Sequence, residues 1–199
     1  MEASYFTRHP FAKDVIQLII FIVCVIIGTI LINSFVFRSY NVVGPSMEET
    51  LYTGDRLIVN RLPVTWSNLR GEDYLPERGQ IIVFKNPHYS RGIEDEYIVK
   101  RVIGLPGERV VLQNGVFTVY NDEHPEGFNP DDDNNGEPGT PTTGEVNTVV
   151  PNGSLFVAGD HRTGTYSYDS RNGLGTIPLY DVIGPVGIRI FPFTEMRFF

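Results

Sequence analysis

The sequence predicts an all-β protein: an antiparallel β-sheet domain with a small β and loop insertion, preceded by one N-terminal transmembrane helix. An uncharged apolar run covers residues 15–37. Beyond it, short runs rich in Val, Ile and Phe alternate with Gly, Pro and Asp, as in β domains. We therefore expect a short cytoplasmic N-terminus at 1–14, a helix at 15–37, and a domain at 38–199 with an insertion at about 107–153.

The apolar run is long enough to cross a membrane. Its residues would form a helix roughly 34 Å long, and the hydrocarbon core of a bilayer is about 30 Å thick. A cleaved signal peptide is the alternative, but its apolar region spans only about 7–15 residues and ends at a small-x-small site. The run is longer, and residues 34–37 (Ser-Phe-Val-Phe) offer no such site. The run is therefore predicted to be a retained anchor in the lipid bilayer.

Basic residues on both sides of the run predict its orientation. Arg8 and Lys13 precede it, and Arg38 follows it. Acidic residues count little in the positive-inside rule, so a cytoplasmic N-terminus is favoured. We expect a single-pass protein of the plasma membrane whose domain at 38–199 lies outside the cytoplasm.

The charge and the cysteine content exclude several functions. The formal net charge is −8, and residues 38–199 carry all of it, which argues against a nucleic-acid partner. The only cysteine, Cys24, lies inside the apolar run. The domain therefore has neither a disulfide nor thiol chemistry, and its core alone must stabilise it.

Seven segments of the domain are predicted to be strands because they are apolar and bounded by turn residues. They are 56–59, 80–84, 97–103, 109–112, 116–120, 154–158 and 182–190. Residues 121–153 are rich in Asn, Asp, Gly and Pro and predict a long surface loop or flexible insertion. Within them, 131–136 matches the first half of an EF-hand calcium loop, but the twelfth position is Thr142, so a solvated acidic loop is favoured.

Ser46 is the first candidate for chemistry, nine residues beyond the apolar run. A serine hydroxyl attacks a carbonyl only when a base removes its proton. The alternative is structural, because Ser46 and Glu49 have the spacing of a helix capping box. Taken alone, the capping role is favoured.

Lys100 is the candidate base. On a strand it shares a face with Ile98 and Val102, and burial among apolar neighbours lowers the pKa of an amine. A neutral amine can act as a general base near neutral pH. The alternative is an edge strand on which Lys100 and Arg101 serve as solubilising charges. Taken alone, this alternative is favoured.

A third segment, 159–171, follows a predicted strand and combines two acids, two arginines and several hydroxyls. Charge-assisted hydrogen bonds can hold such a loop together, and one of its hydroxyls can reach a neighbouring amine. Taken alone, it is typical of a polar turn.

The order of these segments behind an anchor resembles bacterial type I signal peptidases, the Ser/Lys-dyad serine proteases that remove signal peptides from exported preproteins. The resemblance extends from the anchor to about residue 185. It rests on five segments in order, of which 97–108 (Tyr-Ile-Val-Lys-Arg-Val-Ile-Gly-Leu-Pro-Gly-Glu) matches most closely; the others are 44–51, 54–59, 78–84 and 159–171.

The resemblance implies a role for each matching residue. Ser46 would be the nucleophile, Lys100 the general base, and Ser167 the residue that orients the amine. Gly44 stands where some members carry an oxyanion-hole hydroxyl, so a backbone or water donor is expected there. The structural ion pairs would come from Arg101, Asp160, Arg162, Asp169 and Arg171. No metal or cofactor is implied, and the partners would be preprotein signal peptides with small residues before the cut.

The sequence departs from the family pattern at three places. Glu49 replaces a usual proline, His161 replaces a usual asparagine, and residues 163–166 widen the last segment. A Ser–His protease using His88 or His161 is one alternative, and a self-cleaving regulator related to SOS repressors is another. A catalytically inactive membrane-anchored scaffold that binds secretory components is the alternative from a different functional class.

Overall fold

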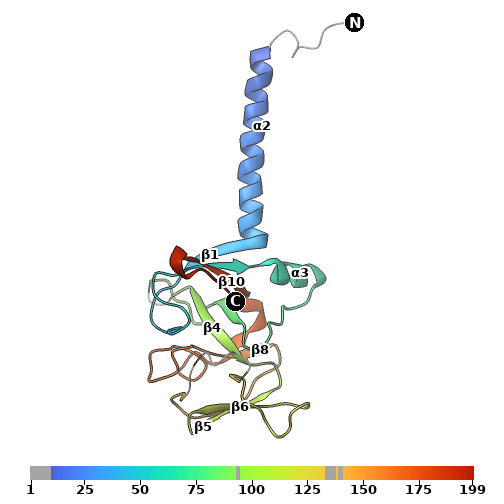
Figure 1. Ribbon diagram of the computed structural model, residues 1–199. Helices are drawn as coiled ribbons and strands as arrows, with labels where there is room; N and C mark the ends of the chain where they lie inside the picture. The colour runs from blue at the N-terminus through green and yellow to red at the C-terminus, as the bar shows by residue number, and fades with distance from the viewer. Residues whose placement is uncertain (1–9, 93–94, 133–137, 139–140) are drawn as a thin grey trace.

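The computed structural model describes residues 10–92, 95–132, 138 and 141–199. A long apolar helix, α2 (Pro10–Leu31), continues into a π-helical turn, η1 (Ile32–Val36). It stands clear of a β domain, as Figure 1 shows, and its window from Lys13 to Val36 has no buried residue. By length and composition it is the one described helix able to cross a membrane. Together, α2 and η1 end at Val36, one residue before the predicted limit, because Phe37 already belongs to the first strand.

Antiparallel strands build the main sheet, in the order β1-β2-β10-β3-β4-β8-β9 with β11 paired to β10. The strands are β1 (Phe37–Asn41), β2 (Arg56–Asn60), β3 (Ile81–Lys85), β4 (Tyr97–Gly104), β8 (Ser154–Ala158), β9 (Ile177–Pro178), β10 (Val182–Phe191) and β11 (Arg197–Phe198). Strand β10 pairs first with β3 and then with β2. The predicted antiparallel all-β fold is confirmed.

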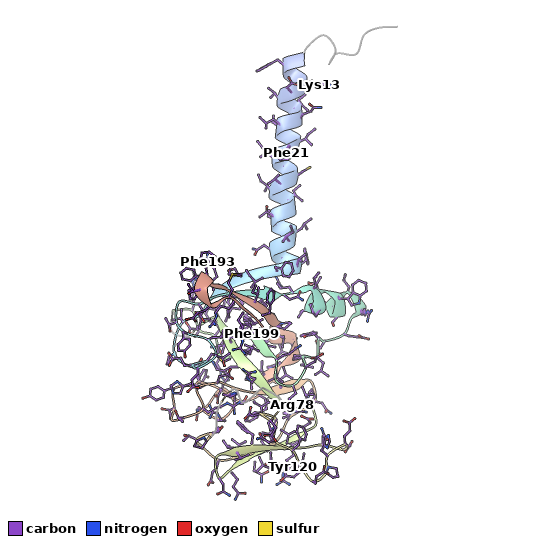
Figure 2. The ribbon with its side chains drawn as sticks, in the orientation of Figure 1. Lys13, Phe21, Arg78, Tyr120, Phe193 and Phe199 are labelled. Carbon is purple, nitrogen blue, oxygen red and sulfur yellow. The ribbon has the colours of Figure 1, made fainter. Side chains whose placement is uncertain are left out.

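A second sheet lies between β4 and β8 in the chain. It contains β5 (Arg109–Gln113), β6 (Val116–Tyr120) and β7 (Val146–Val149), in the order β6-β5-β7. It occupies the end of the molecule far from α2, where Tyr120 is labelled in Figure 2. Strand β7 was not predicted, because its sequence Val-Asn-Thr-Val follows a long polar stretch.

Three apolar clusters form the core. One lies under β3, β4 and β8 around Phe84, a second joins Met47 and Leu51 to β2, and the third joins the small sheet to β8 through Phe117 and Phe156. The second cluster matters for function because it buries residues directly after Ser46. Met47 and Leu51 are completely buried, which fixes the segment between them.

A short helix, α3 (Leu62–Arg70), braces the junction of α2 with the domain. The backbone N–H of Arg61 donates to Val36 O at 2.8 Å, and Thr65 Oγ1 donates to Phe35 O at 2.8 Å. Two 3-10 turns, η2 (Leu179–Asp181) and η3 (Phe193–Glu195), flank β10. Phe193, in η3, lies at the end of the domain nearest α2 (Figure 2).

Candidate active site

Lys100 and Ser46 meet at the centre of the site. Lys100 lies on β4, between β3 and β8, and is 3% exposed. Its Nζ donates to Ser46 Oγ at 2.8 Å and to the carbonyl of Val99 at 2.8 Å. The alternative of a solubilising charge is therefore wrong, because the Lys100 side chain is buried and bonded to Ser46 rather than exposed to solvent.

The surroundings of Lys100 lower the pKa of its amine. Burial lowers the pKa of its amine to about 8, even though the more distant carboxylates of Asp169 and Asp160 act in the opposite direction. In the part of the chain that the structure describes, Lys100 forms no ion pair. The neutral form of the amine is therefore far easier to reach near neutral pH than for a hydrated lysine.

Consecutive turns, rather than a helix, position Ser46. Glu48 N–H donates to Pro45 O at 3.1 Å, and Leu51 N–H donates to Met47 O at 2.7 Å. No helix begins at Ser46, so the capping alternative is wrong, and Glu49 is exposed to solvent. The buried Met47 side chain anchors the turn and leaves the hydroxyl of Ser46 facing Lys100.

The loop after β8 contains a network of buried ion pairs. Arg101 donates to both carboxylate oxygens of Asp160 at 2.8 and 2.6 Å. Arg171 donates to Asp169 Oδ2 at 2.6 Å, and Asp169 Oδ2 also accepts the Gly159 N–H at 2.9 Å. Burial raises the pKa of Asp169, but its bonds to Arg171 outweigh this and hold the pKa below its usual value. These groups fix the loop relative to β4 and β8.

Arg162 has a partner that the sequence did not indicate. Its guanidinium donates to both oxygens of Asp131 at 2.5 and 2.7 Å, and its Nε donates to Gly159 O at 2.9 Å. Asp131 belongs to the stretch predicted to be a solvated loop, yet it is 5% exposed. That stretch is therefore partly ordered against the site. The calcium-loop match falls largely on residues 133–137, outside the described residues.

Ser167 is buried next to the nucleophile segment. Among the described residues its Oγ makes no hydrogen bond of good geometry, and hence none with Lys100. The hydroxyl is nevertheless close enough to Asp169 to help lower the pKa of that carboxyl. Gly159 separates it from Ser46, since a Cβ on Gly159 would overlap both Ser167 Oγ and Ser46 O. Ser167 thus lies beside the site, without the contact to the amine that the resemblance implied.

Gly44 faces open space. Its φ is +88°, and a Cβ there would have no atom within 4 Å. Its N–H donates to Thr53 Oγ1 at 3.0 Å. By contrast, the structure records no acceptor for the Ser46 N–H among the described residues. The Ser46 N–H is thus a free donor beside the hydroxyl.

Neither His88 nor His161 contacts the Ser46 hydroxyl. His88 Nδ1 lies 2.9 Å from Tyr168 Oη, and His161 Nδ1 lies 3.1 Å from Pro45 O. Since the recorded partner of Ser46 Oγ is Lys100 Nζ, the geometry gives the Ser–His alternative no support. Among the described residues, no group of three or more His, Cys, Asp or Glu side chains is placed to hold a metal ion.

A cleft of about 470 Å³ opens over Ser46 and Lys100. Residues 40–46 form one wall and residues 95–100 the other, and Tyr166 and Tyr168 also line it. The first half of β4 pairs with β3, whereas β8 pairs only from Arg101 onward. On the side away from β3, residues 97–99 thus present an edge with no strand partner among the described residues, to which an extended peptide can add.

Two further ion pairs support the site and were not predicted. Arg78 donates to both oxygens of Glu108 at 2.8 and 2.5 Å, which ties the turn after β4 to the segment before β3. Arg189 donates to Asp55 Oδ2 at 3.0 Å and to Thr50 O at 3.2 Å, so it braces the turn that follows Ser46. The partners lie 30 and 134 positions apart, and nothing in one sequence marks them as pairs.

Comparison with known proteins identifies the family. Residues 13–191 match the family model described as signal peptidase, peptidase S26. The chain belongs to this family. A signal peptidase I P from Bacillus subtilis subsp. natto is 35% identical over 178 residues, covering 88% of each chain. Signal peptidase I T from Bacillus subtilis strain 168 is 36% identical over 178 residues, covering 88% of this chain and 85% of that protein.

The similarity also extends to a second genus. Signal peptidase IB from Staphylococcus aureus strain MRSA252 is 30% identical over 203 residues, covering 94% of each chain. Because the family match begins inside α2, it includes the apolar helix and the β domain together. The chain is therefore a membrane-anchored endopeptidase of the serine type.

Proposed function

We propose that this signal peptidase removes N-terminal signal peptides from exported preproteins with a dyad of Ser46 and Lys100. One observation carries the proposal: Lys100 Nζ lies 2.8 Å from Ser46 Oγ, in surroundings that lower the pKa of the amine to about 8. Activation of a serine requires a base within hydrogen-bond distance of its hydroxyl, and the pKa of that base must lie near the working pH.

The reaction begins with the neutral amine. Lys100 Nζ takes the proton from Ser46 Oγ as the oxygen attacks the scissile carbonyl. The new oxyanion accepts the Ser46 N–H, which has no recorded acceptor among the described residues. Lys100 then donates the proton to the leaving amine. It next takes a proton from the water that attacks the acyl ester, and returns a proton to Ser46 Oγ as the ester bond breaks.

The remaining site residues have supporting roles in this proposal. Ser167 orients the amine during the reaction, from a fully buried position beside the segment that carries Ser46. The ion pairs of Asp160 and Asp169 hold the loop that carries Ser167. At Gly44 the open space admits a water as the second oxyanion donor.

The substrate binds as an extended strand along residues 97–99, with small residues before the cut bond. The anchor keeps the cleft near the bilayer where preproteins emerge. We place residues 1–14 in the cytoplasm, 15–37 in the membrane and 38–199 outside the cytoplasm, with the insertion at about 107–153 bearing no catalytic group.

Cleavage of a purified preprotein in detergent or liposomes tests the dyad. We expect Ser46→Ala and Lys100→Met to lose at least about a thousandfold in rate, because each removes a group that makes or breaks bonds. His88→Phe is the control that retains cleavage. Activity retained by Lys100→Met, or an inactive wild type, would refute the dyad. The inactive-scaffold alternative, which the family match does not support, predicts no cleavage by any form.

A further inference from the structure

His161 contacts both peptide groups that flank the nucleophile. Its backbone N–H donates to Ser46 O at 3.1 Å, and its ring Nδ1 lies 3.1 Å from Pro45 O. A single residue from the loop after β8 thus bonds two successive carbonyls in the turn that presents Ser46. The mechanism above makes no use of these contacts.

The Pro45 carbonyl belongs to the same rigid unit as the Ser46 N–H. The peptide bond between them is trans, so the carbonyl and the N–H point in opposite directions from one plane. A bond that fixes the direction of Pro45 O therefore fixes the direction of the Ser46 N–H. Likewise, the bond to Ser46 O fixes the next peptide plane.

The surroundings of His161 hold it in place. The Tyr166 ring packs on the imidazole, with centroids 4.7 Å apart and planes 32° from parallel. Glu48 Oε2 lies 3.7 Å from Nδ1. The preceding residue, Asp160, is held by two bonds from Arg101. The imidazole therefore sits on a braced loop rather than on a free surface.

We infer that His161 is a positioning residue that aims the Ser46 N–H at the developing oxyanion. This inference rests on the proposed function, because it assigns the residue that orients one donor of that site. Glu48 N–H also donates to Pro45 O, so loss of the imidazole bond loosens the peptide plane without freeing it completely.

The bond from His161 Nδ1 to Pro45 O determines which substitutions of His161 are informative. The ring donates from Nδ1 both as the cation and as the Nδ1-protonated neutral tautomer, so the contact does not require a charge. An asparagine Nδ2 branches from the same position of the side chain and can make the same bond. Phenylalanine keeps a ring for Tyr166 to pack on but has no donor.

The test compares steady-state cleavage of a fluorogenic peptide, with small residues before the scissile bond, by the full-length wild type, His161→Phe and His161→Asn. We expect kcat of His161→Phe to fall by about tenfold or more, with KM within about threefold, because oxyanion donors act in the transition state. His161→Asn should restore most of kcat. The pH midpoint of kcat should stay unchanged in both, since Lys100 is untouched.

His124→Phe is the matched control, because His124 lies in the insertion and contacts Phe128 and Glu126. It should keep wild-type kcat. The inference is refuted if His161→Phe keeps kcat within twofold, if its loss is confined to KM, or if His161→Asn is impaired as strongly as His161→Phe. An inactive wild type, or cleavage that survives Ser46→Ala, refutes the proposed function instead.

Discussion

The two faces of β4 carry neighbouring cations in opposite situations. Lys100 and Arg101 are 3% and 7% exposed. Arg101 makes a bidentate pair with Asp160, with N–O distances of 2.8 and 2.6 Å. In the described part of the chain, Lys100 has a hydroxyl and a carbonyl as acceptors and no carboxylate. One cation is neutralised by its partner, and the other loses affinity for its proton.

This difference separates a structural charge from a reactive one. A buried charge is tolerated when a counterion compensates for lost hydration, and an uncompensated amine shifts its pKa instead. Arginine suits the first situation because it remains protonated, and lysine suits the second because its pKa moves readily. Because side chains alternate along a strand, the consecutive residues Lys100 and Arg101 of β4 point to opposite faces, and each face holds one kind of cation.

The largest effect should come from breaking the buried ion pair between Arg101 and Asp160. Asp160→Asn leaves Arg101 buried without its counterion, and removing one partner of a buried pair costs about 3–5 kcal/mol. We expect a matching fall in the free energy of unfolding of the protein in detergent, measured with denaturant. Lys100→Met should leave that free energy unchanged or raise it. Equal losses in both variants would contradict the distinction between the two faces.

A second effect should come from filling the space at Gly159, which lies between Ser46 and Ser167. Gly159→Ala puts a methyl group where Ser167 Oγ and Ser46 O now lie, so the nucleophile segment must move. Because misplacement by about 1 Å can cost a hundredfold in rate, we expect a loss of this order in kcat. At Gly187 the nearest atom to an added Cβ is Ile58 O at 3.6 Å, so Gly187→Ala is a control that should keep its rate. If Gly159→Ala kept the wild-type kcat, displacement of the segment that carries Ser46 would not limit the reaction, and this prediction would be wrong.

The smallest effect is the pH response of the unpaired amine. Burial lowers the pKa of Lys100 from 10.5 to about 8, so cleavage should rise as pH increases through about 8. Between these two values the unfolded chain holds more protons on this lysine than the folded chain, so stability should rise with pH across that window. Rate profiles and unfolding curves from pH 6 to 10 would show both trends. A rate midpoint near 10 would contradict them.

The strands and the site partners were predictable from local pattern and motif order. Lys100 stands among branched apolar residues on a strand, but this segment alone favoured a solubilising charge on an edge strand. The order of the motifs behind the apolar run is what indicated a buried base. The capping and edge-strand alternatives for Ser46 and Lys100 failed because each considered its own segment alone. The burial of Met47 and the burial of the Lys100 side chain are tertiary facts, and they decided both cases.

Long-range pairs that no motif marks were beyond prediction. Asp131 looked like part of a solvated acidic loop, yet it neutralises Arg162 from 31 positions away. Strand β7 is polar along half its length and forms because β5 offers an edge to pair with. The contact of His161 with Pro45 O depends on how the loop after β8 folds back, 116 positions along the chain.

The ionisation of Lys100 is the most direct test of the account. The sequence has three lysines, Lys13, Lys85 and Lys100, so the signals of ¹⁵Nζ-labelled lysine can be assigned with Lys85→Arg and Lys100→Met. The account predicts that the signal lost in Lys100→Met titrates near pH 8 in the full-length protein. Titration of that signal above pH 10 would show a hydrated ammonium and would contradict the dyad.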